Sequence, residues 1–305
     1  MTALLDGATE LPHLGVIRAQ GADAASFLHS QLTQDFAALA GDHARLAAFC
    51  NAKGRMLASF IAFRRSDDEL LLVCSRDLLA PTLKRLSMFV LRAKAKLTDA
   101  TDEFMLRGIA GPSTQGLCGI ESTPWTMRRC GEADVITLYP ADDQARVLWV
   151  APAGAAEPGF PALPLDLWRW SEVRSGVATL QAAVAEAFVP QMLNYESVGG
   201  VNFKKGCYPG QEVVARSQFR GTLKRRGYLV HAQAPMHAGQ EIFHESDAQQ
   251  PAGIVAQASP APEGGSDAIV SMQVAAAQGG RLTLGSADGP TLEMLQLPYL
   301  LLEDV

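Results

Sequence analysis

One stretch of this sequence concentrates residues that could carry out chemistry. Residues 202–216 read Asn-Phe-Lys-Lys-Gly-Cys-Tyr-Pro-Gly-Gln-Glu-Val-Val-Ala-Arg, with a single cysteine, Cys207, between Gly206 and Gly210. Because glycine has no Cβ, the two glycines allow a tight bend and a close approach of the backbone to a ligand. Lysines and a helix start beside a cysteine favour the thiolate, which is its nucleophilic and metal-binding form. The stretch therefore predicts a functional thiol in a glycine-flanked loop.

The same region carries concentrated positive charge. Between Lys204 and Arg226 there are seven basic residues and one acid, Glu212, in a chain whose formal net charge is −6. A helix expected over 211–218 would add the positive end of its dipole to this field. Such a local field favours an anionic ligand or partner. The candidate anion-binding residues are Lys204, Arg216, Arg220, Arg225 and Arg226.

A purely structural interpretation of the loop remains open. Free cysteine is commonly a small core residue, so Cys207 can equally be a buried side chain in a tight turn. The basic residues around it would then be solvated surface groups. The residue types alone do not decide between a functional thiol and a structural one.

Composition limits the classes of protein to which the chain can belong. Its 305 residues, 48% hydrophobic and 19% charged, suit a soluble globular protein of about two domains. A pI near 5.5 argues against a protein that coats nucleic acid with its whole surface. The five cysteines form no Cys-x-x-Cys pair, so we expect neither a disulfide framework nor a metal site. With no evident secretion signal or apolar membrane span, we expect a cytoplasmic protein without membrane contact, and a monomer.

Hydrophobic patterns divide the chain into three units, of which the first covers 1–102. Strand patterns occur at 14–19, 45–50, 56–64 and 70–74, and helical patterns at 24–36 and 78–89. The turn Asn51-Ala52-Lys53-Gly54 between two strands is typical of a hairpin. Strands and helices that interleave with hairpins indicate an α+β fold.

The second unit is expected over 103–226, a second α+β subdomain that ends in the cysteine loop. It contains strand patterns at 104–109, 133–139 and 145–151 and a helical pattern at 165–176. The third unit, 227–305, has short strand patterns at 227–232, 241–244, 253–258, 268–274, 281–284 and 292–297. Short strands at this spacing, separated by turns, predict a small C-terminal β-barrel.

Several motifs together resemble the YgfZ-type folate-binding proteins. The signature is Lys-Gly-Cys-Tyr-Pro-Gly-Gln-Glu at 205–212, which is highly specific. Gly199-Gly200-Val201-Asn202-Phe203, Lys53-Gly54-Arg55 and Leu91-Arg92-Ala93-Lys94 also look like that family. The resemblance extends over nearly the whole chain.

This resemblance implies a relative of the glycine cleavage system aminomethyltransferase (T-protein), with tetrahydrofolate or a derivative bound in a central cavity among three subdomains. It implies an accessory role in the formation or repair of iron–sulfur clusters. The partners would be iron–sulfur client enzymes, including tRNA-modifying enzymes, or assembly proteins. It suggests Cys207 at the mouth of the cavity, and folate-binding residues at Asn202, Lys205, Gly206, Tyr208, Gly210, Gln211, Glu212 and Arg174.

One departure from the aminomethyltransferases bears on the reaction. Those enzymes carry paired aspartates on the strand after the hairpin turn, where this chain has Ala58 and Ser59. Alanine transfers no proton, and a serine hydroxyl needs a nearby base. A later Glu-x-Gly corresponds here to Arg174-Ser175-Gly176. We therefore expect a folate-binding protein rather than a conventional enzyme.

Two other functions stay open on the sequence alone. The first is a folate-dependent aminomethyl or one-carbon transferase, which the missing aspartates disfavour. The second is a tRNA-binding module that makes a weak contact through Arg220, Lys224, Arg225 and Arg226. That module predicts an RNA affinity that falls steeply with salt.

Overall fold

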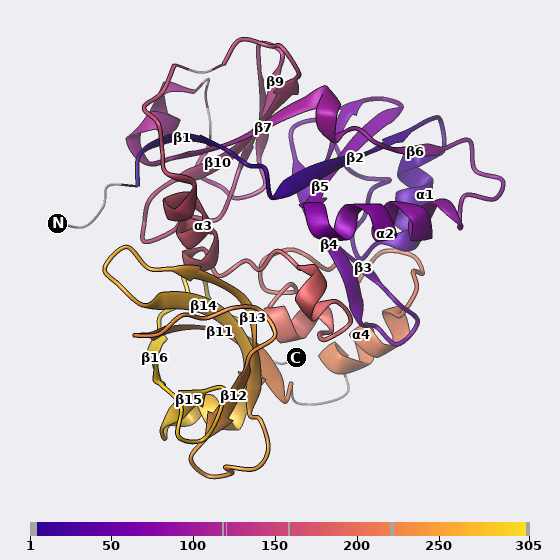
Figure 1. Cartoon of the computed structure of the whole chain (residues 1–305). Helices are drawn as coiled ribbons and strands as arrows, with labels where there is room; N and C mark the ends of the chain where they lie inside the picture. Colours follow the sequence, from indigo (N-terminus) through magenta and orange to yellow (C-terminus); the bar gives the residue numbers. More distant parts are fainter. Residues whose placement is uncertain (1–4, 118, 120, 158, 220–222, 303–305) are drawn as a thin grey trace.

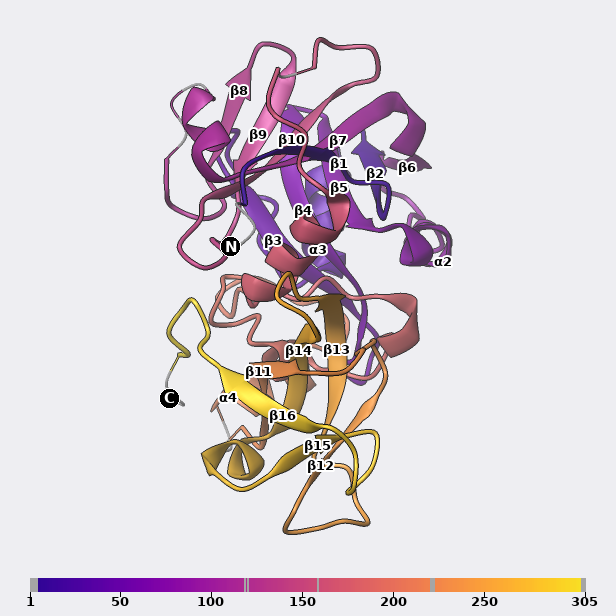
Figure 2. The same ribbon diagram turned by 60° about the vertical axis from the view of Figure 1, so that its left-hand side comes forward.

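The protein combines two β-sheets, their covering helices and a closed β-barrel. A computed structural model describes residues 5–117, 119, 121–157, 159–219 and 223–302. The two sheets occupy one half of the molecule and the barrel the other (Figure 1). In the turned view, a mostly irregular segment that follows residue 174 lies between the sheets and the barrel (Figure 2).

The first sheet has the strand order β3-β4-β5-β2-β6, and every neighbouring pair is antiparallel. Its strands are β2 (Leu14–Gln20), β3 (Ala44–Cys50), β4 (Met56–Ser66), β5 (Glu69–Ser75) and β6 (Lys96–Asp99). Helices α1 (Ala24–Gln31) and α2 (Arg76–Ser87) cover one face, where Leu28 and Leu79 belong to the same buried cluster as Leu72. Strand side chains alternate between faces, so Leu71 points to the other side.

The second sheet has the order β1-β7-β10-β9-β8 and is also antiparallel. Its strands are β1 (Gly7–Glu10), β7 (Phe104–Ala110), β8 (Met127–Cys130), β9 (Ala133–Thr137) and β10 (Arg146–Pro152). Along β10, Val147 and Trp149 pack into an outer cluster, whereas Leu148 and Val150 point toward the first sheet. The alternation gives each face of this sheet its own core.

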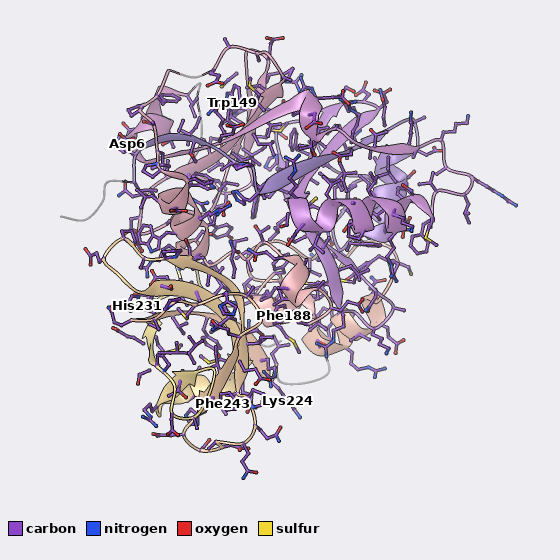
Figure 3. The ribbon with its side chains drawn as sticks, in the orientation of Figure 1. Asp6, Trp149, Phe188, Lys224, His231 and Phe243 are labelled. Atoms are coloured by element: carbon purple, nitrogen blue, oxygen red, sulfur yellow. The ribbon has the colours of Figure 1, made fainter. Side chains whose placement is uncertain are left out.

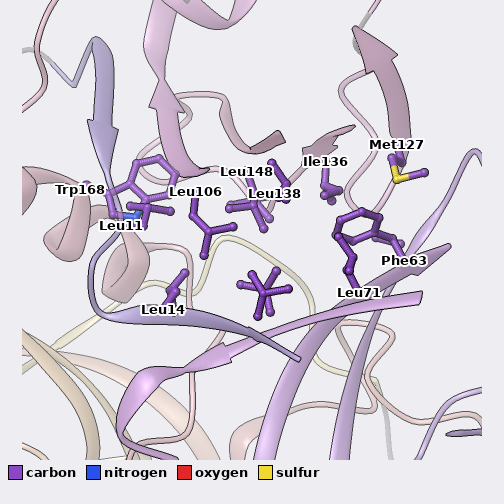
Figure 4. Close-up of a cluster of buried hydrophobic side chains, with 14 of the residues drawn as sticks. Leu11, Leu14, Phe63, Leu71, Leu106, Met127, Ile136, Leu138, Leu148 and Trp168 are labelled. Carbon is purple, nitrogen blue, oxygen red and sulfur yellow. The ribbon is translucent and has the colours of Figure 1, made fainter. Parts of the chain in front are cut away.

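A shared hydrophobic core joins the two sheets. Figure 4 shows Phe63 and Leu71 of the first sheet facing Ile136 and Leu148 of the second. Trp168 of α3 (Leu165–Arg174) closes one end of this cluster and is 1% exposed. Burial of each such side chain stabilises the fold by roughly 1.5–3 kcal/mol. The core fixes the face-to-face arrangement of the two sheets.

The C-terminal unit is a closed barrel with the order β11-β14-β13-β12-β15-β16. Its strands are β11 (Arg225–Ala232), β12 (Glu241–His244), β13 (Gly253–Pro260), β14 (Ser266–Gln273), β15 (Leu282–Leu284) and β16 (Thr291–Leu295). The barrel has its own hydrophobic core, which includes Val230, Ile242 and Val270.

Among the described residues, the remaining elements are α4 (Gln211–Phe219) and five 3₁₀ turns. These turns are η1 (Thr101–Glu103), η2 (Gly111–Gly116), η3 (Ala182–Val184), η4 (Pro190–Leu193) and η5 (Val274–Gln278). Phe188, in the segment between η3 and η4, lies in the middle of the molecule (Figure 3). It belongs to a cluster that also contains Met56 of β4 and Leu229 of the barrel, so this segment joins the three units.

The structure confirms the predicted fold class and most predicted elements, including the hairpin of β3 and β4 and the C-terminal barrel. It adds β1, β6 and β8, short strands that carry little hydrophobic alternation. β1 pairs with β7 and so lies in the second sheet, although the sequence pattern places it in the first unit. The helix predicted over 24–36 ends at Gln31. Among the described residues, no helix is long and apolar enough to span a membrane.

Candidate functional site

A narrow cavity lies where the two sheets and α3 meet. Its free volume is about 50 Å³, so a bicyclic ligand requires the lining side chains to move apart. The polar residues of its lining are Ser59, Tyr139, Arg146, Glu172, Ser175 and Thr179. Apolar and aromatic residues supply the rest, including Phe60, Trp125 and Trp168. A mostly apolar hollow with a few convergent polar groups is typical of a small-molecule site.

An open groove adjoins this cavity. Its volume is about 430 Å³, and Glu172 and Thr179 line both the groove and the cavity. Arg76 and Arg169 also line the groove. The shared residues make the groove the natural mouth of the cavity. The lining of the groove holds two arginines and two carboxylates, those of Asp77 and Glu172.

Glu172 is the buried carboxylate of the cavity. Its Oε1 accepts a hydrogen bond from Trp168 Nε1 at 2.9 Å and lies 3.0 Å from Nε2 of His13. Burial acts to raise the pKa of Glu172, but the hydrogen bond and charge of His13, the charge of Arg146 and the Trp168 hydrogen bond together hold it below its usual value. The carboxylate is therefore ionised at neutral pH.

Arg146 faces the same space from the start of β10 and is 3% exposed. Its guanidinium stacks on Trp168, 4.4 Å from the ring centroid, and one nitrogen donates to the Tyr139 carbonyl at 3.3 Å. Burial lowers the pKa of Arg146 to about 10, against the opposing charge of Glu172. Within the described chain its Nε has no hydrogen-bond partner. A buried donor without a partner is costly, so this atom favours a ligand that brings an acceptor.

The cavity residues Glu172 and Arg146 were not singled out by the sequence reasoning. A signal existed for both. Glu172 lies four residues after Trp168, which places it on the same face of a helix as a large aromatic. Arg146 opens an otherwise apolar strand that is buried on both faces. A charge at such a position needs a partner or a function.

Ser59, at one position where aminomethyltransferases have an aspartate, does line the cavity. Its Oγ accepts a hydrogen bond from the Leu180 N–H at 2.9 Å. Ala58 points to the opposite face of the sheet, into the cluster under α1 and α2. Neither position provides a proton-transfer group.

The cysteine loop lies elsewhere, against α1 and the β3–β4 hairpin. Cys207 is exposed, whereas Cys50 and Cys74 are buried and burial raises the pKa of each of these two thiols to about 12. Lys205 is 7% exposed, and its Nζ donates to the carbonyls of His29 and Leu32 at the end of α1. The ammonium group also lies 4.6 Å from the ring centroid of Tyr208, which is buried. Lys205 therefore anchors the loop.

Gly210 brings two parts of the chain together. Its φ is +81°, and a Cβ there would lie 2.4 Å from the Asn51 carbonyl oxygen and 2.7 Å from Gly54 Cα. The sequence predicts that a ligand approaches the backbone closely at this glycine. In the structure, the turn of the β3–β4 hairpin makes that close approach. Gly206 differs, because the nearest atom to a Cβ there is His29 Nε2 at 3.5 Å.

The other predicted folate ligands in this region make local contacts. Asn202 Oδ1 accepts from the Lys204 N–H at 2.8 Å, and the Gln211 N–H donates to the Tyr208 carbonyl at 3.2 Å. Glu212 forms an exposed ion pair with Arg216 at 2.6 Å. These bonds shape the loop and the first turns of α4.

The basic residues of the predicted anion site do not converge. Arg226 is buried and pairs with Glu196 at 2.7 Å, and Arg225 donates to the Ala252 carbonyl at 3.0 Å. Lys204 and Lys224 are exposed. Arg220 lies outside the described residues. Arg225 thus bonds within the barrel, whereas Arg226 joins the barrel to the segment that carries Glu196.

Arg174 points away from the cavity toward the barrel. Its guanidinium pairs with Asp142, and Asp267 lies 3.6 Å away. No residue of the cysteine loop, nor Arg174, lines the central cavity. Cys207 is exposed and does not line this cavity among the described residues, so its expected place at the mouth of a folate-binding cavity stays a prediction. The core cluster of Cys50, Met56 and Val214 lies between the hairpin, the loop helix α4 and the barrel.

We predict that Lys205 makes stability depend on pH. Burial lowers the pKa of its ammonium group from 10.5 to about 8, against the opposing charges of Asp35 and Cys207. Between about pH 8 and pH 10.5, Lys205 is therefore still protonated in the unfolded chain but already neutral in the folded protein. Because the unfolded state binds more protons, the free energy of unfolding rises with pH in this interval. Lys205→Met should remove this rise, which amounts to roughly 3 kcal/mol. Urea unfolding of both proteins across the interval measures it, and parallel pH profiles would contradict it.

A second prediction concerns the contact between loop and hairpin. Gly210→Ala should lower the free energy of unfolding by about 2 kcal/mol or more, because of its positive φ and the clash with the hairpin. Gly206→Ala is the matched control and should change it by less than about 0.5 kcal/mol. Urea denaturation measures both. Equal effects of the two substitutions would show that Gly210 does not pack against the hairpin.

Comparison with known proteins identifies the family. The model of the GCVT N-terminal domain family matches residues 6–119. The tRNA-modifying protein YgfZ of Shigella sonnei is 32% identical over 237 residues, which cover 73% of this chain and 71% of that protein. The chain belongs to the YgfZ family. YgfZ of Edwardsiella ictaluri is 28% identical over 82% of this chain and 79% of its own length.

A solved structure shares the fold of this chain. Glycine cleavage system aminomethyltransferase T from Bartonella henselae superposes with a TM-score of 0.70. The match covers 97% of this chain and 86% of that protein at 16% identity, so it shows a common fold. Both comparisons confirm the resemblance seen in the sequence motifs.

Proposed function

We propose that this YgfZ family member binds tetrahydrofolate in the central cavity and supports the formation or repair of iron–sulfur clusters in client enzymes. The observation that carries the folate assignment is the pairing of an ionised buried carboxylate, Glu172, with the unpartnered Nε of Arg146 in one aromatic-lined cavity. Relatives named tRNA-modifying proteins point to tRNA-modifying enzymes among the clients.

The donor set of the cavity suits a reduced pterin. The amino-pyrimidine edge of a pterin offers N–H donors, which the Glu172 carboxylate can accept, and charge-assisted bonds of this kind are the strong ones. Arg146 can donate to the pterin oxo group. Trp125, Tyr139 and Trp168 supply flat apolar walls. In the adjoining groove, which Asp77 also lines, Arg76 and Arg169 are the groups that can pair with the anionic glutamate tail of a folate. When bound, tetrahydrofolate supplies a carrier of one-carbon groups.

The cavity is built for binding rather than for proton transfer. Glu172 is held ionised by His13, Arg146 and Trp168, so it is a poor general acid. Ser59 has no base beside it in the described chain and accepts a backbone hydrogen bond. These features disfavour the alternative of an aminomethyl or one-carbon transferase.

We assign Cys207 to the interaction with client enzymes. It is exposed on the surface, and the loop that carries it is held on α1 by Lys205 and on the hairpin at Gly210. An accessible thiol on a fixed loop can release its proton to solvent and, as the thiolate, coordinate an iron atom of a client's cluster without a change of oxidation state. Its separation from the cavity makes folate binding and thiol chemistry two distinct activities.

Calorimetric titration tests the folate assignment. Tetrahydrofolate, 5-formyl-tetrahydrofolate and 5-methyl-tetrahydrofolate are titrated into the full-length protein. We expect binding of at least one of them with one-to-one stoichiometry. No heat with any of the three, checked by a thermal-shift assay with the same ligands, would refute it.

A further inference from the structure

A second concentration of positive charge lies outside the cysteine region. Five basic residues and no acid lie between Lys84 and Lys96, in a chain of net charge −6. The five are Lys84, Arg85, Arg92, Lys94 and Lys96, and all are exposed. Within the part of the chain that the structure describes, none of their side chains makes an ion pair or a hydrogen bond. We call this region, 84–96, the α2–β6 patch; its loop projects from the sheet between α2 and β6 (Figure 1).

The α2–β6 patch also exposes large apolar side chains. Met88 is 68% exposed, Phe89 45% and Leu91 85%. Meanwhile Val90 and Ala93 of the same segment pack against the core under the helices. The segment thus buries Leu86 and packs Val90 and Ala93 inward, while Met88, Phe89 and Leu91 face outward among the cations. Single exposed apolar residues are ordinary, but a contiguous group marks an interaction site.

The backbone holds this surface in place. The Lys94 N–H donates to Asp23 Oδ2 at 2.7 Å, and the Asp23 N–H donates to the Lys94 carbonyl at 3.1 Å. The N–H groups of Phe89 and Val90 donate back to the last turn of α2, to Leu86 and Ser87. The exposed side chains therefore project from a fixed loop, which lowers the entropy lost on binding.

We propose that the α2–β6 patch binds RNA that has unpaired bases, as in the loops of a tRNA. Lysine and arginine together neutralise phosphates, and an aromatic side chain among them stacks on a splayed base. Three of the five cations are lysines, a residue depleted from protein–protein interfaces, whereas nucleic-acid interfaces are strongly positive. Lys84 and Arg85 also complement the C-terminal dipole of α2, but Arg92, Lys94 and Lys96 have no such structural role. This inference goes beyond folate binding and does not depend on it.

The test measures binding of fluorescently labelled, unfractionated bacterial tRNA to the full-length protein by anisotropy over a range of salt. Five cations predict a slope of log affinity against log salt of about −3.5. The variant Arg92→Gln/Lys94→Gln/Lys96→Gln should lose at least about tenfold in affinity at low salt and about 2 units of this slope. Phe89→Ser should lose about tenfold with the slope unchanged.

A charge-matched control separates the α2–β6 patch from overall charge. Lys204→Gln/Arg216→Gln/Lys224→Gln also removes three exposed cations and should keep the wild-type affinity. An equal loss in both triple variants, or no loss in either, overturns the proposal. The proposal is also overturned if the patch variants keep their tRNA affinity but lose client activity in cells. That result would assign the patch to a protein partner. Folate titrations stand apart from this assay, so failure of one leaves the other intact.

Discussion

Glu172→Gln should weaken tetrahydrofolate binding by at least about 30-fold. The substitution keeps the shape of the side chain but replaces the carboxylate, whose two oxygens would accept hydrogen bonds from the N–H groups of the pterin, by a neutral amide. Loss of one partner of a buried, charge-assisted hydrogen bond costs about 2–5 kcal/mol, and 2 kcal/mol corresponds to roughly 30-fold. Calorimetry of wild-type protein and variant measures the difference in dissociation constant.

The matched control for this variant is Glu212→Gln. Glu212 lies in the family signature but is exposed, and its partner among the described residues is Arg216 on α4. Its substitution should leave folate affinity within about twofold, since surface ion pairs contribute little. The reverse pattern, with Glu212→Gln weakening binding and Glu172→Gln without effect, would place folate at the cysteine loop instead.

Cys207→Ala should abolish support of client enzymes while the fold and folate affinity stay intact. The thiol is exposed, so its removal creates no cavity, and the free energy of unfolding should change by less than about 0.5 kcal/mol. The measurement is the level of a tRNA modification that depends on an iron–sulfur enzyme, in cells in which only the variant is present. We expect at least about a tenfold fall.

Cys130→Ala provides the control for that experiment. Cys130 is a half-buried cysteine at the end of β8, in the second sheet. Its substitution should leave tRNA modification at the wild-type level. Full modification with Cys207→Ala would remove the thiol from the mechanism and leave the signature loop a structural role.

Local patterns predicted the architecture well. The strand patterns of β3 and β4, the turn at Gly54 and the short strands of the barrel each depend on neighbours in sequence, and the structure has them where expected. β1 was missed because a strand of four residues carries almost no periodicity, and its partner β7 is about 100 residues away. Pairing over such a distance cannot be inferred from one sequence.

The site was harder to predict because its parts meet only in three dimensions. The signature motif was easy to recognise in the sequence. In the structure, however, Lys205 donates to carbonyls at the end of α1, and Arg226 forms an ion pair with Glu196. The basic residues that lie close together in the sequence therefore do not form one group of unpaired charges in the structure. Glu172 and Arg146 stand 26 positions apart and carry no motif, so only the fold brings them to one cavity.

Hydrogen–deuterium exchange with and without tetrahydrofolate tests the central assignment most directly. Binding in the cavity should slow exchange around residues 59–61, 138–148 and 168–179, each of which contributes several side chains to the lining. Exchange over 202–219 should stay the same. Protection confined to 202–219, with the cavity segments unchanged, would contradict the account and return the folate to the cysteine loop.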